Sequence, residues 1–465
     1  LINVNCVDIN VMMSLTTINY NGKLQDKTKL INDLKKLKQS NAAGLMIDVW
    51  WGIVEAQPGV YNLDGYEEFV KIAVSLKFKV QPVMSFHKCG GNVGDECNIP
   101  IPTWVSKIAQ DKKLYYTDQD GNQQDEYLSS SADDQRLFPS NSSKFRTPVE
   151  MYSDFMKAFA AKFDPYLKNG SINNIQIGVG PASEMRYPSY PSNLWAFPGV
   201  GRFQASDALF KQAAALHNVV IPTVNGSYNS SAAETDFFTI GYKTDQGVKF
   251  LNFYEEMLFN HTKKIKDEAQ KAFPATTLSI KVSGIHWMYG HPSHAAELTA
   301  GYINLNNSGY QSIIQKVLGD KVHFDFTCLE MKNSQQEPKA LAQPETLVRQ
   351  VIDVVKSQNA KMGGENALPV WDKAGYDQIT KQIKYAGRSF EQFTYLRMTD
   401  ALFEEKNFDQ FCKFVKQFTT IGTDAIIGII FGGLALVVAL VIVIIVVMKK
   451  KGTGETQSLI DNDYT

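Results

Sequence analysis

Residues 175–191 read IQIGVGPASEMRYPSYP, an apolar run that ends in a Gly-Pro turn. The acidic residue Glu184 follows the turn directly, with Arg186 and two tyrosines close behind it. A short apolar run bounded by a turn is typical of a buried strand, so the acid is expected where that strand ends. Two interpretations stay open: an ion pair between Glu184 and Arg186 within a loop, or a catalytic acid in a sugar pocket.

Seven further apolar runs of this kind occur, and segments with helical spacing, such as 28–39 and 344–358, separate them. In chain order the eight runs are NVMMSL (10–15), GLMIDVWW (44–51), KVQPVMSF (79–86), IQIGVG (175–180), LSIKVSGI (278–285), VHFDFTCL (322–329), AKMGGEN (360–366) and QFTYLRM (392–398). Strands that alternate with helices indicate an α/β fold with a parallel sheet, and eight of them predict a (β/α)8 TIM barrel. The alternative is a doubly wound open sheet. Such a sheet would carry a Gly-rich dinucleotide fingerprint directly after a strand, and none follows any of the eight runs.

Ionisable residues end or follow seven of these runs. They are Asp48, His87, Glu184, His286, Glu330, Glu365 and Arg397. Because the active site of a TIM barrel lies at the C-terminal ends of its strands, we expect these side chains to gather in one pocket. The long segments after the third and fourth runs, 88–150 and 184–250, are expected to be the loops that build it.

Paired carboxylates at strand ends, with aromatic residues nearby, favour glycoside hydrolysis. That reaction needs one protonated carboxyl group for the leaving oxygen and a second carboxylate as base or nucleophile. Aromatic faces stack on sugars, and polar groups orient the sugar hydroxyls. Candidates for stacking are Trp50, Trp51, Trp287, Tyr187 and Tyr190, and candidates for hydroxyl contacts are Asp48, His87, Lys281 and Asn366.

Seven collinear motifs give a more specific indication. They are DVWWG (48–52), SFHKCGGNVGDECNIPIP (85–102), GPASEMRYPSYP (180–191), IKVSGIHWMY (280–289), HAAELTAGYINLN (294–306), FTCLEM (326–331) and GENALP (364–369). Together they resemble the β-amylase family over about residues 10–418, in the family's order. The resemblance implies an exo-acting, inverting hydrolase that releases β-maltose from the non-reducing ends of α-1,4-glucans such as starch and glycogen.

The resemblance also implies roles for residues. Glu184 is expected to be the proton donor, with a raised pKa, and Glu365 the ionised base that activates water. An inverting enzyme separates the two carboxyl groups by roughly 6.5–9.5 Å. The expected substrate-binding residues are Asp48, His87, Asp95, Lys281, His286, Thr327, Asn366, Ala367 and Arg397, with Asp95 in a Gly-rich lid and Thr327 in an inner loop.

Some positions need separate comment. Ser183 stands where the family usually has Gly, so its hydroxymethyl group either crowds the turn or adds a hydrogen bond. Glu330 has no proton-transfer role in the family, and a structural hydrogen bond is expected for it. Cys89 and Cys97 match the spacing of bacterial members and could form a small disulfide that limits lid motion. No metal and no cofactor are predicted.

The composition is that of a globular protein. The chain has 465 residues, of which 44% are hydrophobic and 20% are charged, and its formal net charge is −1. This near-neutral balance gives no electrostatic argument for nucleic acid as a partner. We expect a monomer whose partner is an α-1,4-glucan.

Residues 425–448 form a charge-free apolar segment. At about 1.5 Å per residue it reaches roughly 36 Å, enough to cross a bilayer core of about 30 Å. It therefore predicts one C-terminal transmembrane helix, by which the protein would contact the membrane. Three lysines, 449–451, follow it, and the positive-inside rule then places the tail, 449–465, in the cytosol.

The predicted organisation is thus a catalytic barrel over 1–420 in a single-pass membrane protein. The barrel would be lumenal or extracellular, in an endolysosomal or cell-surface membrane. Six Asn-x-Ser/Thr sites agree with a glycoprotein: Asn141, Asn169, Asn225, Asn229, Asn260 and Asn306. The alternative function is a catalytically inactive glucan-binding receptor in the membrane, but the presence of both Glu184 and Glu365 favours the enzyme.

Overall fold

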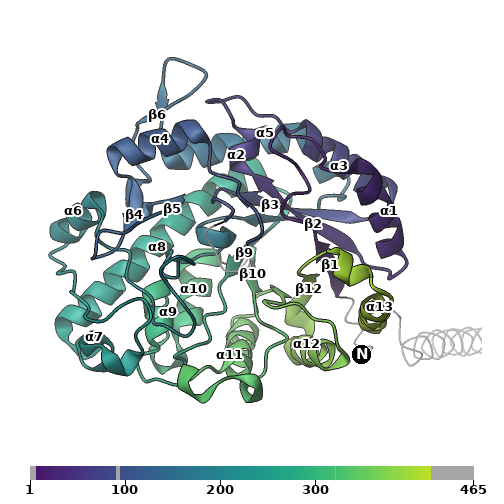
Figure 1. The fold of residues 1–465 in the computed structure, drawn as a ribbon. Helices are drawn as coiled ribbons and strands as arrows, with labels where there is room; N and C mark the ends of the chain where they lie inside the picture. Colours follow the sequence, from purple (N-terminus) through teal and green to yellow (C-terminus); the bar gives the residue numbers. More distant parts are fainter. Residues whose placement is uncertain (1–6, 91–94, 320, 420–465) are drawn as a thin grey trace, which may run out of the picture. The chain divides into compact units, whose positions relative to one another are not determined.

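The computed structural model describes residues 7–90, 95–319 and 321–419, and Val7–Lys416 form one compact unit. Eight parallel strands of this unit close into a barrel (Figure 1). They are β1 (Asp8–Met12), β2 (Gly44–Trp50), β3 (Lys79–Ser85), β8 (Asn174–Ile177), β9 (Thr277–Val282), β10 (Val322–Phe326), β11 (Met362–Glu365) and β12 (Phe390–Tyr395). Around the barrel the order is β1-β12-β11-β10-β9-β8-β3-β2. The predicted TIM barrel is therefore confirmed.

Each apolar run overlaps one barrel strand, but every run ends one to three residues after its strand. The residues just beyond the strands stay buried, as Phe86, Val179, Ile285 and Leu329 show. Burial continues there while the hydrogen-bonded ladder has stopped, and a hydropathy pattern reports only burial.

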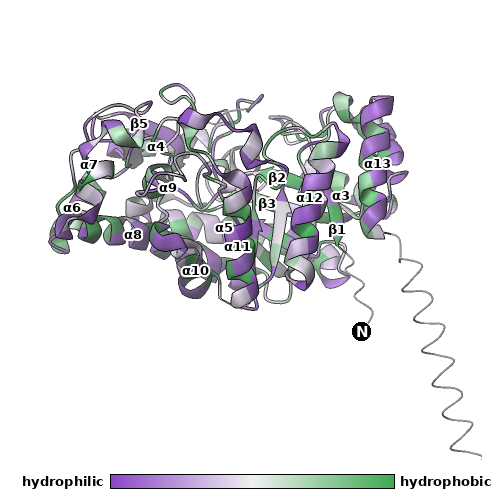
Figure 2. Cartoon of the chain, turned by 90° about the horizontal axis from the view of Figure 1, so that it is seen from below, coloured by the Kyte–Doolittle hydropathy of each residue, from purple (hydrophilic) through white to green (hydrophobic). Residues whose placement is uncertain are grey.

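Amphipathic helices surround the barrel. They include α1 (Lys27–Lys38), α3 (Asp64–Ser75), α5 (Pro148–Lys168), α8 (Asp245–Ala272), α11 (Pro344–Ser357) and α12 (Lys373–Ala386), and α13 (Glu405–Thr419) is the last described helix. In α11, Leu347, Val351 and Val355 recur at helical spacing and are buried. Figure 2 shows hydrophilic residues on the outer sides of α11 and α12.

The two longest loops follow β3 and β8, as predicted. The first contains α4 (Thr103–Lys112) and two small antiparallel hairpins, β4 (Tyr115–Thr117) with β5 (Gln123–Leu128) and β6 (Phe138–Pro139) with β7 (Phe145–Arg146). The second contains α6 (Ala208–Leu216) and α7 (Asp236–Thr239). Two short helices, α2 (Trp51–Val54) and α9 (Ala295–Ala300), follow β2 and β9, and α10 (Gly309–Ile313) precedes β10.

Polar side chains fill part of the barrel interior. Gln392 Nε2 donates to Gln81 Oε1 at 3.0 Å, and Gln176 Nε2 donates to Asp325 Oδ2 at 3.0 Å. Each bond joins strands that are not neighbours in the sheet, so the side chains meet across the interior. Burial raises the pKa of Asp325 to about 7, although bonds from Ser279 and Gln176 oppose this.

The predicted transmembrane helix is not supported by the described part of the chain. There, no helix is both long and apolar enough to cross a bilayer. The long helix α8 spans 28 residues but carries Lys263, Lys264, Asp267 and Glu268 among others, which a bilayer core would exclude. The predicted span, 425–448, and the tail, 449–465, lie outside the described residues.

Candidate active site

A pocket lies where the barrel strands end. It is lined by Met12, Leu15, Met46, Asp48, Trp50, Val83, His87, Asp95, Gln176, Ala182, Ser183, Lys281, Glu365, Leu396 and Arg397. Six residues predicted for the site are among them: Asp48, His87, Asp95, Lys281, Glu365 and Arg397. They come from strands β2, β9 and β11 and from the loops after β3 and β12, so only barrel closure brings them together.

Lys281, on β9, lies between the two candidate catalytic carboxylates. Its Nζ is 3.2 Å from Glu365 Oε1 and 3.9 Å from Glu184 Oε1. The sum of these distances sets an upper limit of about 7 Å on the separation of the two Oε1 atoms, so only the shortest separations of inverting glycosidases are compatible with it. All three side chains are largely buried, so their charges interact with little screening by water.

Glu184 is 9% exposed and, unlike its neighbour Ser183, is not among the residues that line the pocket in the described chain. Its Oε2 accepts from Arg186 Nε at 2.7 Å and from Ser283 Oγ at 2.8 Å. Glu184 therefore forms the ion pair with Arg186, and this pair lies beside the pocket. The two interpretations of Glu184 drawn from the sequence are not exclusive.

The pKa directions differ from the expected ones. Burial opposes ionisation of Glu184 most strongly, but Lys281, Arg186 and Ser283 outweigh it and bring the pKa of Glu184 below its ordinary value. Burial raises the pKa of Glu365, and the negative charge of Glu184 adds to this against the attraction of Lys281. Glu184 has two cationic neighbours, which explains why its pKa is lowered where a raised value was expected.

Asp48 and His87 lie in one chain of hydrogen bonds. Ser85 Oγ donates to Asp48 Oδ1 at 2.7 Å, and Ser183 Oγ donates to Ser85 Oγ at 3.4 Å. Ser183 Oγ also lies 3.1 Å from His87 Nδ1. The hydroxyl group of Ser183 thus adds hydrogen bonds beside Glu184, which answers the question that the sequence left open.

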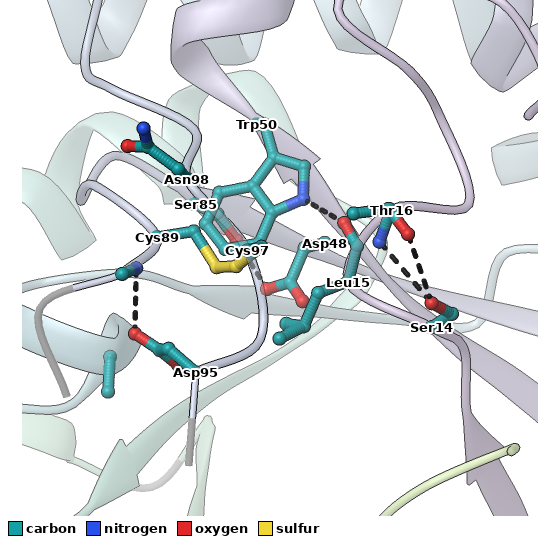
Figure 3. Close-up of a disulfide and its surroundings, with 12 residues drawn as sticks. Ser14, Leu15, Thr16, Asp48, Trp50, Ser85, Cys89, Asp95, Cys97 and Asn98 are labelled. Atoms are coloured by element: carbon teal, nitrogen blue, oxygen red, sulfur yellow. Dashed lines mark hydrogen bonds between the residues drawn. A yellow bond between two sulfur atoms is a disulfide. The ribbon is translucent and has the colours of Figure 1, made fainter. Parts of the chain in front are cut away.

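Asp95 is held beside the pocket by a disulfide-closed loop. Cys89 and Cys97 are bonded, as anticipated from their spacing, and Gly90 N donates to Asp95 Oδ2 at 2.9 Å (Figure 3). Backbone bonds between Cys89 and Ile99 anchor the base of this loop. Figure 3 shows Asp95 and Asp48 on either side of the disulfide.

Four other predicted substrate-binding residues make contacts within the protein and are not among the lining residues that the described chain provides. Thr327 Oγ1 accepts from Gly284 N at 2.9 Å, and Ala367 N donates to Glu330 Oε1 at 3.1 Å. Asn366 bonds the backbone of Leu396 through both ends of its amide.

His286 is the fourth of these residues, and its ring lies 6.0 Å from that of Phe197. Burial lowers the pKa of His286 to about 4. Glu330 bonds the backbone N–H groups of both Ala367 and Leu368, which is the structural role expected for it.

The aromatic residues proposed for stacking on sugars fall into two groups. Trp50 lines the pocket and lies 5.1 Å from the ring of His87. Trp51, Tyr187, Tyr190 and Trp287 are buried and are not among the residues that line the pocket in the described chain, so their role as sugar-contacting walls stays a prediction. Tyr187 instead stacks on Tyr254 at 3.8 Å.

Several lining residues were not predicted from the sequence. Gln176 is the clearest case, because a polar residue inside the apolar run IQIGVG is a detectable exception. Ser283, which bonds Glu184 but is not a lining residue, is likewise a polar residue inside an apolar run, LSIKVSGI. The apolar lining residues Met12, Met46 and Val83 form one packed cluster and read as ordinary core residues in the sequence.

Comparisons with known proteins agree with this geometry. A family model described as glycosyl hydrolase family 14 matches residues 10–424. A β-amylase from Vigna unguiculata is 41% identical over 434 residues, covering 88% of this chain and 86% of the relative. "Beta-amylase 2, chloroplastic" from Oryza sativa subsp. japonica is 42% identical over 438 residues, covering 90% and 78%. The crystal structure of the catalytic domain of β-amylase from Paenibacillus polymyxa superposes with a TM-score of 0.73 at 27% identity, covering 90% of this chain and 99% of that one.

The predicted localisation is corrected by these comparisons. A single-pass membrane protein with a lumenal or extracellular catalytic domain is contradicted by the rice relative, whose name places it in the chloroplast. The prediction relied on the hydropathy of residues 425–448 alone. The hydropathy of one segment does not indicate in which compartment the relatives of a protein are found.

Proposed function

The chain belongs to glycosyl hydrolase family 14 and is a glycosidase that acts on α-glucans, and we propose that it is an exo-acting, inverting enzyme releasing β-maltose from non-reducing ends. The relatives that carry the family assignment are β-amylases and match most of the chain. Nothing in the pocket favours the alternative of an inactive glucan-binding receptor.

The observation that carries the proposal is the placement of Lys281 between two buried carboxylates. Ionising both carboxylates in a buried site is costly, and the neighbouring cations Lys281 and Arg186 offset that cost for Glu184 more than for Glu365. The pair therefore titrates as a unit and passes through a state with one proton between the two carboxyl groups. An inverting glycosidase needs this state, one carboxyl protonated and one ionised.

In the proposed reaction Glu184 gives its proton to the glycosidic oxygen, and Glu365 takes a proton from the attacking water. In the ligand-free site the pKa directions favour the opposite distribution, with the proton on Glu365. A bound glucan would reverse this order, because a glycosidic oxygen accepts a hydrogen bond only from the protonated acid. Substrate binding would thus move the proton to Glu184.

The remaining lining residues suit a glucan. Asp48, His87, Asp95 and Arg397 offer acceptors and donors for sugar hydroxyls, and Trp50 offers an apolar face. We assign substrate contacts also to His286, Thr327, Asn366 and Ala367 on the family resemblance. Thr327 and Asn366 would have to exchange a protein contact for a sugar contact.

The test uses soluble starch and maltooligosaccharides, with the anomer of the first product followed by NMR. Release of β-maltose supports the proposal, whereas α-maltose, glucose or internal cleavage contradicts it. Glu184→Gln and Glu365→Gln should each lower kcat by about 10²–10⁴-fold, while Glu330→Gln, which still accepts backbone hydrogen bonds, should stay within about tenfold.

A second substrate separates the two roles. An aryl α-maltoside with an acidic phenol needs no protonation of its leaving group. Glu184→Gln should therefore recover most of its activity on this substrate, and Glu365→Gln should not. Recovery in Glu365→Gln instead would exchange the two assignments.

A further inference from the structure

The hydroxyl group of Ser183 connects two pocket residues that come from different strands. Ser183 is 2% exposed and lies one residue before Glu184. Its Oγ is 3.1 Å from Nδ1 of His87 and 3.4 Å from Oγ of Ser85. Ser85 continues the chain to Asp48. Four side chains therefore form one path from Asp48 to the ring of His87.

The directions of these hydrogen bonds are determined at the Asp48 end. Ser85 Oγ donates to Asp48 Oδ1, so the hydroxyl hydrogen of Ser85 points to Asp48. The oxygen of Ser85 is then free to accept from Ser183, which uses the single hydrogen of Ser183. With its hydrogen in the bond to Ser85, the oxygen of Ser183 accepts from His87, and this arrangement has the imidazole hydrogen on Nδ1.

The tautomer of the His87 imidazole determines which of its two nitrogens donates and which accepts. Burial, reinforced by the positive charges of Lys281 and Arg186, lowers the pKa of His87 to about 3, so its imidazole is neutral at ordinary pH. A neutral imidazole has one donor and one acceptor nitrogen. With the hydrogen on Nδ1, Nε2 is an acceptor for a donor group in the pocket that His87 lines.

The backbone at Ser183 adds a second observation. Its φ is +59° and that of Ala182 is +52°, a region that non-Gly residues adopt at a cost. The conformation is held in place by Glu126, whose Oε1 accepts from Ala182 N at 2.8 Å. Glycine would occupy position 183 with less strain but would remove the hydroxyl group from the path.

We propose that Ser183 is a positioning residue that holds His87 in the tautomer with hydrogen on Nδ1, so that Nε2 accepts a hydroxyl group of the bound glucan. The identity of that ligand rests on the proposed function, but the effect on the tautomer does not. Ser183 acts through His87 and touches none of the reacting atoms in this account.

Two variants separate the hydroxyl group from the backbone. Ser183→Ala removes the hydroxyl and keeps a Cβ at positive φ, whereas Ser183→Gly removes both. If the hydroxyl group is what matters, the two variants should show the same change at His87. They should differ in thermal stability, with Ser183→Gly melting at the higher temperature.

The first measurement is the tautomer itself. Ring-nitrogen NMR spectra of the full chain labelled with ¹⁵N-histidine distinguish protonated from unprotonated nitrogens, and His87→Gln identifies the signal. The wild type is expected to show hydrogen on Nδ1, and both variants are expected to shift toward hydrogen on Nε2. Unchanged His87 signals in both variants would overturn the proposal.

The second measurement is the division between KM and kcat on maltooligosaccharides. Loss of one neutral hydrogen bond predicts an increase in KM of about 3- to 10-fold, with kcat within about twofold. A normal KM in Ser183→Gly with a raised KM in Ser183→Ala would assign the effect to backbone strain and overturn the proposal. If the wild type releases no maltose, the proposed function fails, while the NMR result still decides the role of Ser183.

Discussion

Arg186 and Glu184 form a buried ion pair, with Nε 2.7 Å from Oε2, directly beside the pocket that holds the second carboxylate. Burial raises the pKa of Glu184, but Lys281 and Arg186 together bring it below its ordinary value, which favours the ionised form when no substrate is bound. A proton donor held in its ionised form has to gain its proton during the catalytic cycle. The pH dependence of turnover therefore depends on the cations around Glu184.

Replacing Arg186 by Met should move one limb of the pH profile. Glu184 loses a positive neighbour, its pKa rises, and it stays protonated to higher pH. The basic limb of kcat should shift upward by about one pH unit or more. The acidic limb should move less, since Arg186 is not among the main influences on Glu365. A shift of the acidic limb alone would contradict this assignment.

Replacing Lys281 by Met should move both limbs. Lys281 lowers the pKa of Glu184 and also opposes the raised pKa of Glu365, so its loss raises both values. The base Glu365 then needs a higher pH to ionise, and the acid stays protonated to higher pH. Profiles of kcat/KM on maltopentaose check this, and Lys281→Arg, which keeps the charge, is the matched control. If both limbs of the pH profile of Lys281→Met stay where they are in the wild type, Lys281 does not couple the titrations of Glu184 and Glu365.

Opening the disulfide should weaken substrate binding more than it affects the fold. Cys89→Ser frees the loop that holds Asp95 in the pocket. The bond closes only a short loop, so the free energy of unfolding should fall by about 3 kcal/mol at most. KM should rise by about 3- to 10-fold if Asp95 contributes one hydrogen bond to the glucan. Cys412→Ser, which alters a free thiol elsewhere, should leave KM unchanged.

Asp325 should make stability depend on pH. Its folded pKa is raised to about 7 from 3.8, so the folded protein keeps a proton that the unfolded chain has lost. The free energy of unfolding should fall as pH rises through this window, by up to about 1.4 kcal/mol per pH unit from this group. Asp325→Asn should reduce that slope in urea titrations at pH 5, 6 and 7. The exposed replacement Asp134→Asn is the control, and equal slopes in wild type and Asp325→Asn would refute the prediction.

Much of the fold was predictable because the barrel repeats one simple pattern. Each buried strand is an apolar run, and eight of them alternate with amphipathic helices. Glu365 was identifiable because it is the last residue of a strand, and Arg397 because it follows one by two residues. These positions depend on local sequence, and the apolar runs locate the strand ends to within three residues.

The contacts that set the charges were not predictable in the same way. Asn366 was expected to contact sugar, but its amide bonds the backbone at Leu396, thirty residues away in sequence. Tyr187 was expected in a sugar wall but stacks in the core on Tyr254. Side chains of similar composition can face either way from a loop, and only packing decides between them.

The sequence by itself determined the number of strands, their order along the chain, and the presence of two carboxylates at strand ends. The tertiary structure decided what surrounds those carboxylates: Lys281 between them, Arg186 and Ser283 on Glu184, and Ser183 joining Asp48 to His87. The reason is physical. Apolar periodicity is a property of neighbours in sequence, whereas a pKa depends on charges a few ångströms away in space, and barrel closure brings those together from strands far apart in the chain.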